Sequence, residues 1–119
     1  MNVSIVMPIH NPDRELLRKI IKSVKSQKFK GKIEIIKVEE GLGLAASLNY
    51  GIKKSKYKVI VSLHQDCLPS DDNWLSNLVR PLEKGPIVAS VSDVFDVENQ
   101  KKYTPLLDEK GCAYKKDKL

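Results

Sequence analysis

The segment Tyr57–Pro69 reads YKVIVSLHQDCLP and joins an apolar run to a polar turn. Residues 59–63 have the β-branched, apolar character of a strand that is buried on both faces. His64, Gln65 and Asp66 follow directly. In an open parallel sheet, ligands bind in the crevice beyond the carboxyl ends of the strands. The pattern therefore predicts that Asp66 presents a carboxylate in such a crevice.

A carboxylate in that position suits a divalent cation. Magnesium and manganese prefer carboxylate oxygen and keep open coordination positions for phosphate. We therefore expect Asp66 to hold manganese or magnesium next to a phosphorylated ligand. The alternative is that Asp66 only forms the turn, since Asp is common directly after strands.

Apolar runs and amphipathic stretches alternate along residues 3–92. The runs expected to form strands are Val3–Ile9, Ile33–Val38, Val59–Leu63 and Pro86–Ser92. The expected helices run from Pro12 to Val24 after an Asn11 cap, from Leu44 to Ile52, and from Trp74 to Leu82 after an Asp71 or Asp72 cap. Such alternation predicts right-handed crossovers and a mostly parallel α/β sheet with helices on both faces, in one domain over residues 1–119. Beyond Asp93 the pattern fades, and a loop followed by a short strand is expected near residues 104–114.

Composition narrows the class of protein. With 41% hydrophobic and 30% charged residues, the chain is not a disordered polymer. Its apolar runs are too short to span a membrane, and Met1 leads directly into a strand without a signal peptide, so the expected location is the cytoplasm. The two cysteines, Cys67 and Cys112, are too few for a disulfide framework or a zinc site. The abundance of lysine leans towards a heat-adapted source.

Positive charge is concentrated in the first half of the chain. Residues 14–58 hold 13 Lys or Arg and 4 acidic residues, whereas residues 59–119 hold 8 and 10. This basic surface is either a solvated helix face, or it attracts phosphate groups, an anionic membrane or nucleic acid. Few aromatic residues, Phe29, Tyr50 and Tyr57, are available to stack bases, which argues against nucleic acid and leaves peripheral membrane contact open.

Three segments, in this order, resemble the family 2 glycosyltransferases. They are SIVMPIHNPDRELLRKIIKSVKSQ (residues 4–27), GLGLAASLNYGI (41–52) and VIVSLHQDCLPSDDNWL (59–75). The resemblance implies the nucleotide-sugar-binding GT-A fold. It also implies metal-assisted transfer of a sugar from a nucleoside diphosphate sugar to a hydroxyl acceptor, whose identity the sequence leaves open.

The resemblance implies roles for individual residues. Asp66 corresponds to the last acid of the family's Asp-x-Asp motif, which contacts the metal. The implied nucleotide-sugar contacts are Pro8, His10, Asn11, Glu39, Glu40, Asn49, His64 and Gln65. His64 stands where the motif has its first Asp and contributes no negative charge, and the loop after the second strand is shorter than is usual in the family.

The family's general base lies in a segment that would follow Leu119. The nearest acidic residues are Asp93 and Asp96, which are either substitute bases or surface loop acids. Two functions therefore stay open, a glycosyltransferase and a catalytically weak nucleotide-sugar-binding or assembly module without a base. An acceptor half missing beyond Leu119 would also leave a sheet edge uncovered, so we expect self-association into a homo-oligomer.

Overall fold

The structure is a computed structural model that describes residues 1–39, 41–91, 94–96, 101–103 and 111–118; for residues 91, 94–96, 101–103, 111, 112 and 118 it describes the backbone alone. The strands are β1 (Val3–Pro8), β2 (Ile33–Val38), β3 (Val59–Leu63), β4 (Ala89–Val91), β5 (Val94–Asp96), β6 (Lys101–Tyr103) and β7 (Gly111–Lys115). The helices are α1 (Arg14–Lys25), α2 (Leu44–Lys54) and α3 (Trp74–Val79), with 3₁₀ turns η1 (Arg80–Glu83) and η2 (Lys116–Lys118).

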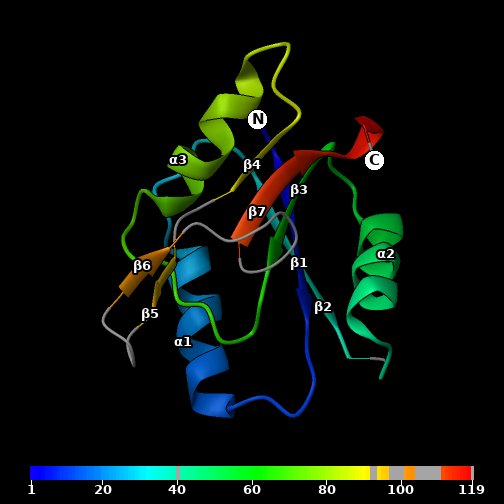
Figure 1. Cartoon of the computed structure of the whole chain (residues 1–119), viewed down its shortest axis with the longest axis vertical. Coiled ribbons are helices and arrows are strands. Elements are labelled where there is room, and N and C mark those ends of the chain that lie inside the picture. Colours follow the sequence, from blue (N-terminus) through cyan, green and yellow to red (C-terminus); the bar gives the residue numbers. More distant parts are fainter. Residues whose placement is uncertain (40, 92–93, 97–100, 104–110, 119) are drawn as a thin grey trace.

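Five strands form the main sheet, in the order β2-β1-β3-β7-β4 (Figure 1). β1 pairs in parallel with both β2 and β3, which confirms the mostly parallel sheet. β7 runs antiparallel to both of its neighbours and separates β3 from β4. The fourth expected strand, residues 86–92, is shorter in the structure, since β4 covers Ala89–Val91 and Ser92 lies outside the described residues.

The polar stretch after Asp93 contains strands that its sequence did not indicate. β5 and β6 pair as a separate two-stranded antiparallel ribbon. With three residues each, they are too short for a period-two pattern to be recognised. The short strand expected near the end of the chain is present as β7.

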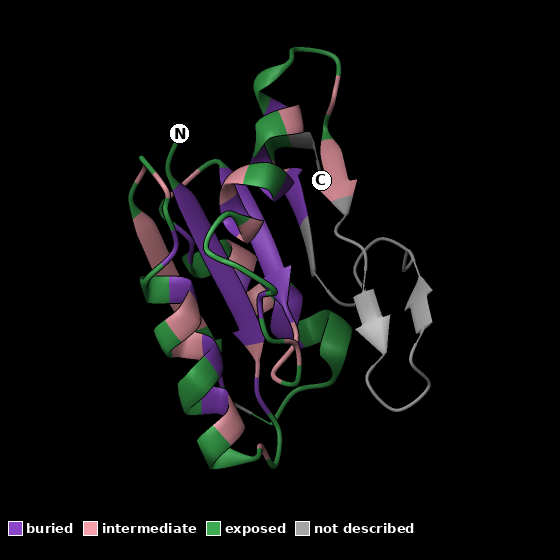
Figure 2. Ribbon diagram, turned by 90° about the vertical axis from the view of Figure 1, so that its left-hand side faces the viewer, coloured by how far each residue is buried: buried purple, intermediate pink, exposed green. Residues whose placement is uncertain are grey.

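Helices cover both faces of the sheet, as predicted. α1 and α3 lie on one face and α2 on the other (Figure 1). Alternate residues of β1 serve the two layers: Val3, Ile5 and Met7 belong to the core with α1 and α3, and Val6 to the core with α2. All four side chains are fully buried, and Figure 2 shows the buried sheet between its helices. None of the helices in the described part of the chain has the length and apolar character needed to cross a membrane.

α2 packs closely on β1 through a glycine. A Cβ added at Gly51 would overlap Val6 Cγ1 and lie 3.0 Å from Val6 Cγ2. Gly51 therefore allows the helix to approach the strand, and it fixes which face of α2 turns towards the sheet.

The helix starts differ from two of the predictions. Asp13, and not Asn11, caps α1, because its Oδ1 accepts the N–H groups of Glu15 and Leu16, each at 3.1 Å. Helix α1 consequently begins at Arg14 and not at Pro12. Asn11 instead has a φ of 42°, in the left-handed region, and belongs to the turn before the helix.

The first turn of α3 is hydrogen-bonded by a residue that follows the end of α1. Neither Asp71 nor Asp72 occupies the cap position, which falls on Asn73. The buried Gln27, just beyond α1, accepts the Leu75 N–H through Oε1 at 3.0 Å and donates through Nε2 to Asp71 O at 2.7 Å. One amide thus joins the end of α1 to the start of α3.

A hydroxyl and a carboxylate connect the amino-terminal ends of the three parallel strands. Ser4 Oγ donates to Glu34 Oε2 at 2.6 Å and accepts the Tyr57 N–H at 3.2 Å, and Glu34 Oε2 also accepts the Lys56 N–H at 3.0 Å. Burial raises the pKa of the Glu34 carboxyl, but the hydrogen bonds from Lys56 and Ser4 and the positive charges of Lys56 and Lys116 outweigh it. The pKa of Glu34 is therefore lowered.

Candidate functional site

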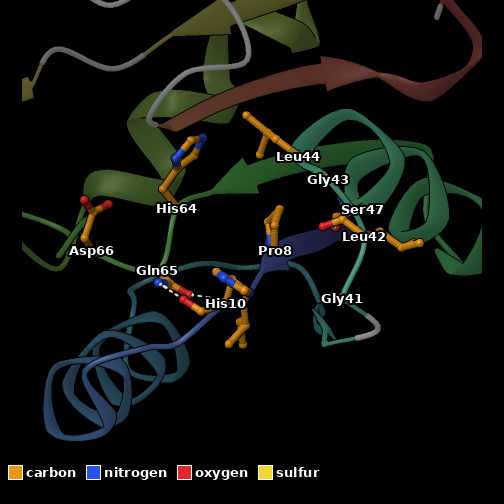
Figure 3. A pocket seen from close by; sticks show the side chains of 11 residues that line it. Pro8, His10, Gly41, Leu42, Gly43, Leu44, Ser47, His64, Gln65 and Asp66 are labelled. Atoms are coloured by element: carbon orange, nitrogen blue, oxygen red, sulfur yellow. Dashed lines mark hydrogen bonds between the residues drawn. The ribbon is translucent and has the colours of Figure 1, made fainter.

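A cleft of about 530 Å³ lies where the ends of β1 and β3 meet the start of α2 (Figure 3). It is lined by Pro8, Ile9, His10, Gly41, Leu42, Gly43, Leu44, Ser47, His64, Gln65 and Asp66. Parallel strands end at the same edge of a sheet, so segments far apart in the chain meet there. Of the expected site residues, the structure brings together Pro8, His10, His64, Gln65 and Asp66.

Gln65 binds the backbone of His10 at both ends of its amide. Its Oε1 accepts the His10 N–H, and its Nε2 donates to the His10 carbonyl, both at 2.8 Å. Figure 3 shows these bonds between the turn after β3 and the turn after β1. The amide that was expected to contact nucleotide thus holds the two walls of the cleft together.

His64 and Asp66 project from the other side of the same turn. Figure 3 shows both side chains pointing away from His10. The Cys67 N–H donates to the His64 carbonyl at 3.1 Å, which closes the turn, and Cys67 Sγ donates to Asp66 Oδ1 at 3.5 Å. Asp66 is exposed and His64 is half-buried. A carboxylate and an imidazole therefore lie at one rim of the cleft.

The opposite rim is the start of α2. Gly43 is the cap residue and supplies no side-chain hydrogen bond to the first turn. The first N–H groups of a helix lack intrahelical acceptors and carry a partial positive charge. Gly41 has a backbone φ of 72°, which residues other than glycine rarely adopt. Gly41 therefore sets the path of the backbone into the helix.

Ser47, and not Asn49, is the polar side chain that α2 places on the cleft. Ser47 is buried, and its Oγ donates to the Leu42 carbonyl at 3.2 Å. Asn49 is exposed and does not line the cleft. Two helical residues correspond to about 200° of rotation, so the two side chains point to opposite sides. Ser47 lies one residue before Leu48 and four residues before Gly51, both of which are buried. This helical spacing is the signal that identifies the inner face of α2.

Comparison with known proteins identifies the family. Residues 28–118 match the family model of glycosyl transferase family 2. The chain belongs to glycosyl transferase family 2. No curated protein sequence matches it.

Solved structures share the fold of this family 2 domain at low sequence identity. A mannosyltransferase from Pyrobaculum calidifontis, in complex with GDP-Man and Mn²⁺, has a TM-score of 0.73 and 16% identity over 95% of this chain and 44% of its own. TarS 1-349 from S. aureus has a TM-score of 0.57 and 12% identity over 75% and 34%. The 4-diphosphocytidyl-2C-methyl-D-erythritol synthase from Anaerococcus prevotii DSM 20548 also reaches 0.57, with 12% identity over 97% and 71%.

These likenesses confirm the GT-A fold. The chain spans less than half the length of the mannosyltransferase and of TarS. It therefore corresponds to a part of each of those proteins.

The other acidic residues expected in a family 2 site lie away from the cleft or outside the described residues. Glu39 is exposed, lies 3.7 Å from Arg14 Nη1 through Oε1, and does not line the cleft. Glu40 and Asp93 are outside the described residues, and of Asp96 only the backbone, in β5, is described. Asp66 is thus the one carboxylate among the described residues that line the cleft.

Proposed function

We propose that this chain is the donor-binding part of a glycosyltransferase that transfers a sugar from a nucleoside diphosphate sugar to a hydroxyl acceptor, assisted by a divalent cation. The observation that carries the proposal is the cleft itself, which has the Asp66 carboxylate at one rim and the uncapped start of α2 at the other. Between them, a diphosphate would lie near N–H donors and beside a cation held by Asp66.

The residues present fit manganese or magnesium. Within the described ranges, no three His, Cys, Asp or Glu side chains gather to hold an ion. An ion bound together with a substrate diphosphate needs only one or two protein carboxylates, because phosphate oxygens and waters complete its shell. Asp66 would supply that carboxylate, with the His64 imidazole on the same side of the turn. When bound, the ion neutralises charge on the departing diphosphate. The Mn²⁺ and GDP-Man of the mannosyltransferase complex support this choice.

The backbone of the glycine loop and α2 provides the second contact. The N–H groups of Leu44 and Ala45 lie in the first turn after Gly43 and have no side-chain cap. The loop glycines leave their backbone accessible, since a Cβ at Gly41 or Gly43 would meet no atom within 4 Å. We therefore assign the diphosphate to this rim.

A second function, donor binding without efficient transfer, is favoured because the described residues of the cleft include a single carboxylate, Asp66. A general base must lie within hydrogen-bond reach of the acceptor hydroxyl, and such catalysis typically contributes about 10²–10⁴-fold. If Asp66 holds the cation, the described residues of the cleft lining offer no second carboxylate for this task. The chain alone would then transfer sugar slowly, and hydrolysis of the donor by water would be its residual reaction.

Thermal unfolding with nucleotide sugars tests the proposal. We expect GDP- or UDP-sugars with manganese to stabilise the chain, by about 2.7 kcal/mol at a ligand concentration 100 times the Kd. Asp66→Asn should remove the metal-dependent part of this shift, whereas Asp72→Asn, an equally exposed acid in the following loop, should retain it. An equal shift in Asp66→Asn, or no shift with any nucleotide sugar, would contradict donor binding at this cleft.

Release of free nucleoside diphosphate separates the two functions. Donor binding with release near background selects the binding module. Rapid transfer to a defined hydroxyl acceptor selects the enzyme, and loss of that transfer in Asp93→Asn or Asp96→Asn would identify a substitute base.

A further inference from the structure

The end of the sheet opposite the cleft, where β1, β2 and β3 begin, carries a row of lysines. Val3 of β1 pairs with the first residue of β2 and with the first residue of β3. Lys32 and Lys58, each directly before its strand, therefore lie in the same row of the sheet. The Lys116 N–H donates to the Lys58 carbonyl at 2.7 Å and extends the row beyond β7. β1 lies between β2 and β3, and neighbouring strands are about 4.8 Å apart, so Lys32 and Lys58 lie about 10 Å apart in this row, with Asn2 between them.

Further lysines surround this row. Residues 30–34, 53–58 and 115–117 together hold eight lysines and two acidic residues, Glu34 and Asp117. The Glu34 carboxylate is engaged by the Ser4 hydroxyl and the Lys56 N–H. The lysines are Lys30, Lys32, Lys53, Lys54, Lys56, Lys58, Lys115 and Lys116, of which the first six are exposed. We call these eight residues the lysine edge.

The lysine edge is broad and lies away from the cleft. Figure 1 shows the amino terminus, the carboxyl end of α2 and the end of β7 towards one end of the molecule, while α2 begins near the other. The lysines come from the ends of strands and of one helix, so their charges are spread across a face and do not follow a single helix.

We propose that the lysine edge docks on an anionic lipid surface. Clusters of four to eight basic residues are attracted to anionic membranes, and lysine is a hydrated point charge suited to many interchangeable headgroups. The three segments contain no arginine, whose planar fork favours specific phosphates. Phe29 and Tyr57 nearby are only partly exposed and offer no open platform for stacking bases, so a membrane is favoured over nucleic acid.

Docking in this way sets the orientation of the domain. The cleft would face the aqueous side, where a nucleoside diphosphate sugar is dissolved. The proposal does not depend on donor binding, because it rests on charge at the opposite edge.

Flotation of the 119-residue chain with vesicles tests the docking. The vesicles are phosphatidylcholine alone, or phosphatidylcholine with 30% phosphatidylglycerol, at low and high salt. The test variant is Lys32→Gln/Lys53→Gln/Lys58→Gln. Lys32 and Lys58 form their hydrogen bonds with Asn2, Val3 and Lys116 through backbone atoms, so these bonds are kept in the variant. The matched control, Arg18→Gln/Lys19→Gln/Lys22→Gln, removes the same charge from the exposed face of α1. Thermal unfolding verifies that both variants fold.

We expect the wild-type chain to float with the anionic vesicles at low salt only, and not with neutral ones. Each lysine near such a surface changes partitioning by about fivefold, so the test variant should lose about 100-fold and the control much less. Equal losses in the two variants would show an effect of net charge and overturn the proposal. Failure of the wild-type chain to float, or tighter binding to a DNA duplex than to vesicles at equal salt, would also overturn it.

Discussion

The side-chain amide of Gln65 forms a pair of hydrogen bonds with the backbone of His10, each 2.8 Å long. The amide acts as both acceptor and donor, as a backbone group does in a sheet. The backbone pairing between β1 and β3 ends at Val6 and Ser62, so Gln65 supplies the next connection between these strands. The relative position of the two turns in the cleft therefore depends on one side chain.

Gln65→Ala is expected to lower donor affinity by about tenfold, because the two turns would no longer be held together. Two exposed neutral hydrogen bonds contribute about 1–2 kcal/mol to the free energy of unfolding. Gln65→Glu retains the acceptor for the His10 N–H but loses the donor, and should give an intermediate result. Urea unfolding and calorimetric titration with a nucleotide sugar measure both quantities. Asn49→Ala, on the outer side of α2, is the control, and unchanged affinity in Gln65→Ala would show that the pair does not order the cleft.

Gly51→Ala is expected to destabilise the fold by about 1–2 kcal/mol. The added methyl group would overlap Val6, and overpacking of this size outweighs the roughly 1 kcal/mol gained in helix propensity. Gly85→Ala is the matched control, because a Cβ there would meet no atom within 4 Å. Denaturant unfolding compares the two. Stability equal to wild type in Gly51→Ala would mean that α2 shifts along β1 at no cost.

Glu34→Gln tests the pH dependence of the Ser4–Glu34 contact. The pKa of Glu34 is lower in the folded chain than the value of about 4.3 for an unfolded glutamate. The carboxylate therefore stabilises the fold fully above that value, and its contribution is lost as the pH falls through the folded pKa. We expect Glu34→Gln to cost about 1 kcal/mol at neutral pH and progressively less as the pH falls below the unfolded pKa of about 4.3.

Unfolding free energies of the wild-type chain and Glu34→Gln, measured across that pH range, check this expectation. Glu83→Gln, which removes an exposed carboxylate, is the control. A difference between wild type and Glu34→Gln that stays constant with pH would refute the assignment.

Two substitutions at Asn11 separate a backbone role from a ligand contact. The left-handed φ of 42° costs most residues about 1–2 kcal/mol, which Gly avoids. Asn11→Ala should therefore destabilise the chain by about 1 kcal/mol, and Asn11→Gly should not. If Asn11→Gly nevertheless lowers nucleotide affinity at full stability, the Asn11 side chain takes part in binding, either by contact with the nucleotide, as the family resemblance implies, or through its hydrogen bond with His10 Nε2 at 3.3 Å.

Periodicity in the sequence predicted the sheet well wherever strands are long. β1, β2 and β3 have five or six residues each, and their apolar runs mark them clearly. β4, β5 and β6 have three each, too few for a pattern, and the place of β7 between β3 and β4 follows from long-range pairing that periodicity does not encode. Caps were misplaced because several polar residues precede each helix, and only the backbone conformation distinguishes Asp13 from Asn11.

The location of the candidate site was predictable because parallel strands end at one edge. The roles of its side chains were less so. Gln65 is directed at His10 by the geometry of two turns, and no local sequence signal reports such a bond. Ser47 could have been found from the helical stripe that it shares with Leu48 and Gly51. Asn49 was predicted as the ligand contact on this helix because of the family resemblance, which does not specify the face of the helix.

The position of β7 in the sheet also has a consequence for the order in which the molecule forms during synthesis. β2, β1 and β3 have all left the ribosome once Leu63 has emerged, and every described residue that lines the cleft precedes Cys67. β4 is made later but remains without its neighbour until Gly111–Lys115 emerges, because it pairs with β7. Domains generally fold as units, so the sheet is completed only once β7 has left the ribosome. The described cleft residues are thus made well before the strand that completes the sheet beside β3, and until then the free edge of β3 can pair with another chain.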